Sequence, residues 1–162
     1  MAKKSRSRVN SLPKAPSTDD DQRVSFVRVL VAEDYAPFRQ FVCSTLGERP
    51  ELQIVCEVSD GLEAVQKAEE LQPDLIVLDI GLPSLNGIEV ARRIRKLSPK
   101  SKILFASQES SADVLQLALN LGALGYVIKA HAAGELLDAV DVVLRNEQFV
   151  SKTVIDGNGQ CG

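Results

Sequence analysis

The sequence has no tryptophan, and aromatic residues make up only 4% of its 162 residues. The core must therefore be built from valine, isoleucine, leucine and alanine. Hydrophobic residues at 44% and charged residues at 25% are ordinary values for a globular chain. The length accommodates one domain and is short for two. The single histidine, His131, cannot by itself build a zinc site.

Cysteine is also scarce, and no apolar run reaches the length of a membrane span. Cys43, Cys56 and Cys161 are an odd set without the C-x-x-C spacing of a metal site. Cys43 and Cys56 lie in apolar segments, so we interpret them as small core residues. The basic N-terminus lacks the apolar stretch of a secretory signal. We therefore expect a soluble protein of the reducing cytoplasm.

Neither sign of charge dominates, because the formal net charge is only −3. A nucleic-acid surface spread over the whole domain is therefore not expected. Residues 1–25 are polar with almost no apolar periodicity, which predicts a disordered tail. Residues 26–150 have the apolar pattern of one domain. Residues 151–162 are polar and rich in glycine, which predicts a flexible C-terminal tail.

Within the predicted domain, short apolar segments typical of buried parallel strands alternate with segments of helical periodicity. The expected strands are 26–32, 52–58, 75–78, 102–106 and 126–128. The expected helices are 37–46, 61–71, 87–97, 112–121 and 133–145. Short connections between them predict βαβ crossovers, and therefore an α/β fold in which helices cover both faces of a parallel sheet.

Polar side chains follow four of these strands at the point where each strand ends. Glu33 and Asp34 follow the first strand, Asp79 the third, Ser107 the fourth and Lys129 the fifth. Each alone is more simply a helix cap, a turn residue or a solvated charge. Ligands of open α/β sheets bind beyond the carboxyl ends of the strands, so their coincidence there predicts a binding site.

Three carboxylates held close together need a cation or raised pKa values. A site made of oxygen ligands suits Mg²⁺ better than metals that prefer thiolate or imidazole. A nucleophilic carboxylate beside Mg²⁺, with an ammonium and a hydroxyl opposite, is an arrangement that accepts a phosphoryl group. In that interpretation Asp79 attacks in line, while Lys129 and the metal neutralise charge on the transferred group.

Four motifs carry a family resemblance that covers about residues 27–149. They are V-L-V-A-E-D-Y at 29–35, D-L-I-V-L-D-I-G-L-P at 74–83 with N-G at 86–87, L-F-A-S at 104–107 and G-Y-V-I-K at 125–129. As a set at this spacing, they resemble the receiver domain of two-component response regulators. The resemblance implies a flavodoxin-like, doubly wound (βα)5 sandwich with a parallel five-stranded sheet in the order 2-1-3-4-5.

The resemblance also implies a role for each of seven residues. The phosphoacceptor is Asp79, the Mg²⁺ pair is Glu33 and Asp34, a backbone carbonyl ligand to the metal comes from Gly81, the switch hydroxyl is Ser107, the phosphate-binding lysine is Lys129, and the aromatic that changes rotamer on activation is Tyr126. Two residues depart from the family pattern. Ala130 stands where many receivers have proline, so a cis peptide is not expected, since it would cost about 2.5–4 kcal/mol. Glu33 is longer than the usual aspartate and is expected to reach the metal through water.

As a receiver, the chain is expected to take its phosphoryl group from a sensor histidine kinase or a phosphotransfer protein. Its output is expected to be a downstream protein or a second copy, bound through the helix at 112–121, the strand at 126–128 and the helix at 133–145. No conventional enzyme activity and no membrane partner are expected. The segment N-E-Q-F-V-S at 146–151 resembles NarL/FixJ-type regulators, in which a DNA-binding helix-turn-helix follows the receiver. The sequence contains no such output domain, so DNA binding would require one.

Three alternatives remain open at this point. The chain could be a degenerate receiver that binds partners without phosphate, or a fragment of a DNA-binding regulator. It could also be a flavodoxin-like or nucleotide-binding enzyme on the same architecture, because a fold does not determine a function. The last is disfavoured, since no G-x-x-x-x-G-K-[ST] is present and no G-x-G-x-x-G follows the first strand.

Overall fold

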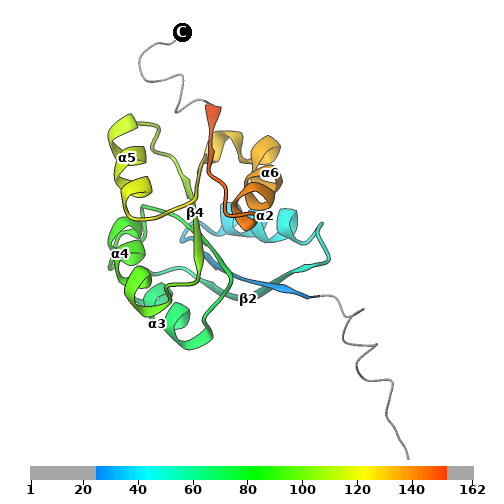
Figure 1. The fold of residues 1–162 in the computed structure, drawn as a ribbon, viewed down its shortest axis with the longest axis horizontal. Helices are drawn as coiled ribbons and strands as arrows, with labels where there is room; N and C mark the ends of the chain where they lie inside the picture. Colours follow the sequence, from blue (N-terminus) through cyan, green and yellow to red (C-terminus); the bar gives the residue numbers. More distant parts are fainter. Residues whose placement is uncertain (1–24, 153–162) are drawn as a thin grey trace, which may run out of the picture.

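The computed structural model describes residues 25–152, which form a six-stranded parallel sheet between two layers of helices (Figure 1). The strands are β1 Val27–Ala32, β2 Leu52–Val58, β3 Leu75–Leu78, β4 Lys102–Ser107, β5 Gly125–Ile128 and β6 Phe149–Val150. The helices are α2 Ala36–Leu46, α3 Gly61–Leu71, α4 Gly87–Leu97, α5 Ala112–Asn120 and α6 Ala132–Leu144, with a short 3-10 helix, η2, at Lys129–His131. The strand order is β2-β1-β3-β4-β5-β6. The predicted α/β fold and the order of its five strands are confirmed.

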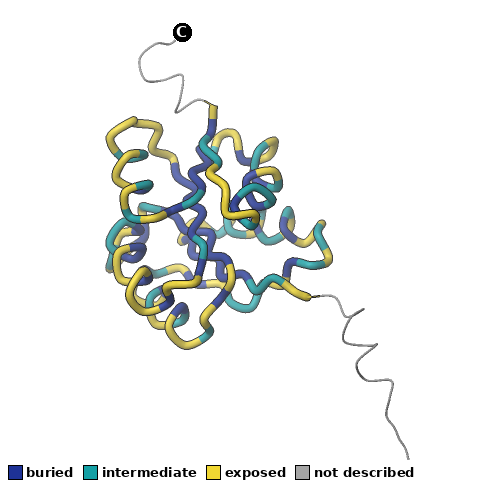
Figure 2. The backbone as a smooth tube through the Cα atoms, in the orientation of Figure 1, coloured by how far each residue is buried: buried dark blue, intermediate teal, exposed yellow. Residues whose placement is uncertain are grey.

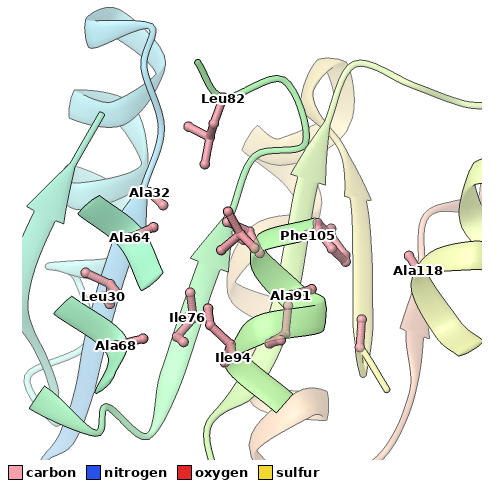
Figure 3. Close-up of a cluster of buried hydrophobic side chains, with 14 of the residues drawn as sticks. Leu30, Ala32, Ala64, Ala68, Ile76, Leu82, Ala91, Ile94, Phe105 and Ala118 are labelled. Carbon is pink, nitrogen blue, oxygen red and sulfur yellow. The ribbon is translucent and has the colours of Figure 1, made fainter. Parts of the chain in front are cut away.

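Alternation of side chains along the strands divides the core between the two faces of the sheet. In β1, Val29 and Val31 pack on one face and Leu30 and Ala32 on the other, and all four are buried. The face with Leu30 is covered by α3, α4 and α5 (Figure 3), and the opposite face is covered by α2 and α6 (Figure 1). The buried backbone in Figure 2 accordingly follows the central strands. Burial on both faces explains why these strands are continuous apolar runs.

Side-chain caps set the start of three helices that follow strand ends. Asp60 accepts the Glu63 N–H at the start of α3, and Asn86 accepts two amides at the start of α4. Ser111 accepts the Val114 N–H at the start of α5. Each cap satisfies amides that have no partner within the helix, which stabilises the turn leading from the sheet edge into the helix.

The sixth strand is a correction to the predicted five-stranded sheet. Phe149 and Val150 pair in parallel with Gly125 and Tyr126, so β6 covers the outer edge of β5. Ser151 follows β6 and is fully buried, although the predicted C-terminal tail begins at this residue. The rest of both predicted tails, 1–24 and 153–162, lies outside the described residues. No helix in residues 25–152 is long and apolar enough to cross a bilayer.

Candidate functional site

The backbone at the carboxyl edge of the sheet brings the predicted acidic residues together. The Glu33 N–H donates to the carbonyl of Val58 at 2.9 Å, and the Asp79 N–H donates to the carbonyl of Ala32 at 3.0 Å. These bonds continue the pairing of β1 with β2 and β3 past the strand ends. Asp79 is therefore held one residue beyond β3, directly beside Glu33 and Asp34.

Gly87 sets the distance between α4 and the chain that carries Asp79. The Gly87 N–H donates to the carbonyl of Ile80 at 2.7 Å. A Cβ at this glycine would lie 2.1 Å from the carbonyl oxygen of Asp79, far inside contact distance. Only a residue without a side chain allows the first turn of α4 to approach so closely. The N-G motif at 86–87 thus combines a helix cap with this close approach.

A cavity of about 860 Å³ opens above the carboxyl ends of the strands. Twelve residues line it, namely Asp34, Tyr35, Phe38, Asp79, Ile80, Gly81, Ser107, Gln108, Glu109, Ile128, Lys129 and Ala130. Five of the seven residues assigned from the sequence are in this lining. Glu33 and Tyr126 are not in the lining, although Glu33 contacts the lining residue Lys129.

Three carboxylates meet in the site. One oxygen from each of Glu33, Asp34 and Asp79 lies within 4.8 Å of the other two. Glu33 and Asp79 are 2% and 6% exposed, whereas Asp34 is exposed to solvent. Hard oxygen donors with one solvated member fit the preference of Mg²⁺, which keeps several of its waters. These residues therefore fit the predicted cation.

Lys129 balances part of this negative charge. Its Nζ lies 2.8 Å from Oε1 of Glu33 and 3.4 Å from Oδ1 of Asp79. The Tyr35 N–H donates to the second Glu33 oxygen at 2.9 Å. Burial raises the pKa of the Glu33 carboxyl, and the hydrogen bond from Lys129 opposes that rise. The carboxylate of Glu33 is thus closer to the lysine than the carboxylate of Asp79 is.

Ser107 and Tyr126 both hold the loop between β4 and α5. The Glu109 N–H donates to Oγ of Ser107 at 3.0 Å, and the Tyr126 hydroxyl donates to the Glu109 carbonyl at 2.8 Å. The Tyr126 ring is fully buried against Phe105, with centroids 6.2 Å apart. Burial raises the pKa of the Tyr126 phenol. Tyr126 is therefore already turned inward, and its strand is not an edge strand because β6 covers it.

Two contacts in the site have no counterpart in the sequence-based assignment. Phe38 places its ring 4.9 Å from Nζ of Lys129, and Tyr35 lines the cavity while 63% exposed. Phe38 lies four residues after Asp34 within the apolar repeat of α2, which predicts a core position and gives no sign of its contact with Lys129. The peptide before Ala130 is trans, as expected, since residues 25–152 contain no cis peptide bond.

The family model of the response regulator receiver domain matches residues 29–141. A protein-glutamate methylesterase/protein-glutamine glutaminase of Thermotoga maritima is 40% identical over 66% of this chain and 31% of its own length. The transcriptional regulatory protein DegU of Brevibacillus brevis is 31% identical over 79% of this chain and 54% of its own length. The chain thus spans between about a third and a half of these relatives.

Solved structures show the same architecture. A LuxR-family two-component response regulator from Aurantimonas sp. SI85-9A1 matches with a TM-score of 0.77 and 29% identity, covering 82% of this chain and 94% of that one. The response regulator domain of Thermotoga maritima CheB matches with a TM-score of 0.69 and 34% identity, covering 74% and 97%. Because the family model spans well over half of the sequence and both folds agree, the chain belongs to the response regulator receiver domain family.

Proposed function

We propose that this chain is a phosphoacceptor in a His-Asp phosphorelay and that it is phosphorylated on Asp79 with the help of Mg²⁺. The observation that carries the proposal is a nearly buried carboxylate that opens into a cavity beside an ammonium, a hydroxyl and two further carboxylates. A structural ion pair needs neither the cavity nor the acidic cluster. A phosphoryl acceptor needs both.

In the proposed reaction, one carboxylate oxygen of Asp79 forms a bond to phosphorus while the bond from phosphorus to the donor breaks. With a phosphohistidine donor, the electron pair and a proton go to the departing imidazole. Bound Mg²⁺ would neutralise charge on the phosphoryl oxygens. Lys129 is close enough to Asp79 to bind one of these oxygens. Ser107 lines the same cavity and offers its hydroxyl to another.

The partners follow from this chemistry. The donor is a sensor histidine kinase or a histidine-containing phosphotransfer protein. The output is a change in affinity for a downstream protein or for a second copy, at the face formed by α5, β5 and α6. Ser107 and Tyr126 both bond to Glu109 in the loop that precedes α5. A phosphoryl group that draws Ser107 toward Asp79 would break its bond to this loop and alter the position of α5.

The decisive experiment is incubation of the full chain with acetyl phosphate and Mg²⁺, followed by intact mass spectrometry. We expect one phosphoryl adduct, absent from Asp79→Asn and present in the control Asp74→Asn, which changes an aspartate at the opposite end of β3. An adduct that persists in Asp79→Asn would contradict the assignment. No adduct in the unaltered chain would favour the phosphate-independent binding module.

The two acidic residues after β1 are expected to contribute unequally to the metal site. Asp34 is exposed and forms no ion pair with any residue of the described range 25–152, whereas Glu33 is buried and paired with Lys129. We expect Asp34→Ala to abolish the Mg²⁺ dependence of phosphorylation and Glu33→Ala to weaken it less. The measurement is the initial rate of adduct formation against Mg²⁺ concentration. Equal losses in the two variants would show that this ranking is wrong.

A further inference from the structure

The ammonium of Lys129 has three neighbours of two kinds. Two are anions, Glu33 at 2.8 Å and Asp79 at 3.4 Å, and the third is the aromatic ring of Phe38. The distance of 4.9 Å from Nζ to the ring centroid lies within the range of a cation–π interaction. The lysine side chain is only 14% exposed, so little water competes for these contacts.

The two anionic contacts cannot stay constant if the proposed function holds. Glu33 is a candidate metal ligand, and a carboxylate bound to a cation is a weaker partner for the lysine. Asp79 loses its free carboxylate when it is phosphorylated, and the new anion lies farther from the backbone. Lys129 must therefore exchange both partners during each cycle. The ring of Phe38 is neutral. It neither coordinates the metal ion nor binds a phosphoryl oxygen, so its contact with Lys129 can stay the same.

The ring of Phe38 is also held firmly in place. It packs against the core between the sheet and the α2–α6 layer, and the tilted ring of Phe41 lies beside it with centroids 5.6 Å apart. Its helix, α2, begins two residues after Asp34, with Pro37 in its first turn. The ring thus moves with the same backbone that carries the acidic pair.

We propose that Phe38 is a positioning residue of the phosphorylation site. Its ring keeps the Lys129 ammonium beside Asp79 while the ammonium exchanges carboxylate oxygens for phosphoryl oxygens. This inference rests on the proposed function and adds a residue that acts through Lys129. Since partly desolvated cation–π contacts contribute modestly, we expect loss of the ring to weaken binding of a phosphoryl mimic about 3- to 10-fold.

The contact itself can be tested in the unphosphorylated full chain by NMR. A ring face below the ammonium shifts the ε-methylene protons of Lys129 upfield. We expect Phe38→Leu to remove that shift while keeping an apolar side chain of similar kind. Phe38→Tyr restores the ring and should restore the shift. Phe41→Leu is the matched control, because it removes the neighbouring ring and leaves the Phe38 ring packed against the core and facing Lys129.

The consequence is tested by titrating the same variants with beryllofluoride in the presence of Mg²⁺ and measuring Kd from amide chemical shifts. We expect weaker binding in Phe38→Leu and values near that of the unaltered chain in Phe38→Tyr and Phe41→Leu. Equal affinity in Phe38→Leu, with the unaltered chain binding, would overturn the positioning role alone. No binding by the unaltered chain would overturn the proposed function and this inference with it.

Discussion

Ser151→Ala removes a hydroxyl that closes the outer edge of the sheet. The hydroxyl accepts the N–H of Ile128 at 2.9 Å and donates to the carboxylate of Glu135 on α6. The backbone of Ser151 also donates to the carbonyl of Tyr126 at 2.9 Å. Ser151 is fully buried, so water cannot replace the hydroxyl in the native state.

The expected cost follows from the group that loses its partner. After Ser151→Ala the buried N–H of Ile128 has no acceptor, and an unsatisfied buried donor costs about 1–3 kcal/mol. The backbone bond to Tyr126 survives the change, so β6 should stay in place. With a urea m-value of about 2 kcal/mol/M, this loss lowers the urea midpoint by roughly 0.5–1.5 M.

The assay is urea unfolding followed by far-UV circular dichroism, with Ser44→Ala as the control. Ser44 lies on the exposed face of α2, so its replacement should change stability by no more than about 0.5 kcal/mol. If Ser151→Ala and Ser44→Ala have the same midpoint, the hydroxyl does not satisfy Ile128 in solution. The hydroxyl of Ser151 would then contribute nothing to the stability of the fold.

Two further predictions concern the loops around the site. Gly87→Ala should destabilise the fold by about 1–3 kcal/mol, because its Cβ would meet the Asp79 carbonyl at 2.1 Å. Gly134→Ala is the control in thermal unfolding, because nothing lies within 4 Å of a Cβ added there and alanine favours a helix. An equal loss of stability in the two variants would contradict the steric argument. Asp60 accepts hydrogen bonds from the Ser84 side chain and from the N–H of Glu63 in the first turn of α3. These bonds lower the pKa of Asp60 below its ordinary value of 3.8. The stability that the ionised cap contributes is therefore present above pH 3.8 and is lost as the pH falls through the lower folded-state pKa. Urea midpoints measured between pH 5 and pH 2.5 should fall less steeply for Asp60→Asn than for the unaltered chain. Equal slopes for the two would show that the ionised Asp60 cap does not contribute this stability.

The central part of the fold could be predicted because burial on both faces leaves a clear mark on a sequence. β3 is an unbroken apolar run and β1 is apolar from Val29 to Ala32, and the helices between them repeat apolar residues at helical spacing. The acidic residues and Lys129 could be placed because each directly follows a strand. In a parallel sheet this position alone brings them to one edge.

The missed features depend on contacts between distant segments. Phe149–Val150 is too short for a periodic signal, and it is a strand only because the edge of β5 lies beside it. Phe38 fits the apolar face of α2, so periodicity assigns it to the core. Periodicity cannot show that Lys129, about ninety residues later, lies over its ring. The predicted sheet ended at its fifth strand, so the pairing of Tyr126 with Val150 of β6 was not foreseen.

The presence of β6 changes what the proposed output face can be. The segment from Phe149 to Ser151 occupies the outer edge of β5. It donates to the carbonyls of Leu124 and Tyr126, and it accepts the N–H of Ile128. The outer edge of β5 therefore offers no open backbone groups along this stretch, and a partner cannot add a strand there without displacing β6. A partner that leaves β6 in place must instead bind side chains of α5 and α6. Leu117 on α5 is 43% exposed, but it lines a groove with Ile88 and Arg92 of α4 and so lies toward the α4 side of α5. The proposed output face is thus suited to contact between helices, with the loop at Glu109 linking α5 to the proposed phosphorylation site.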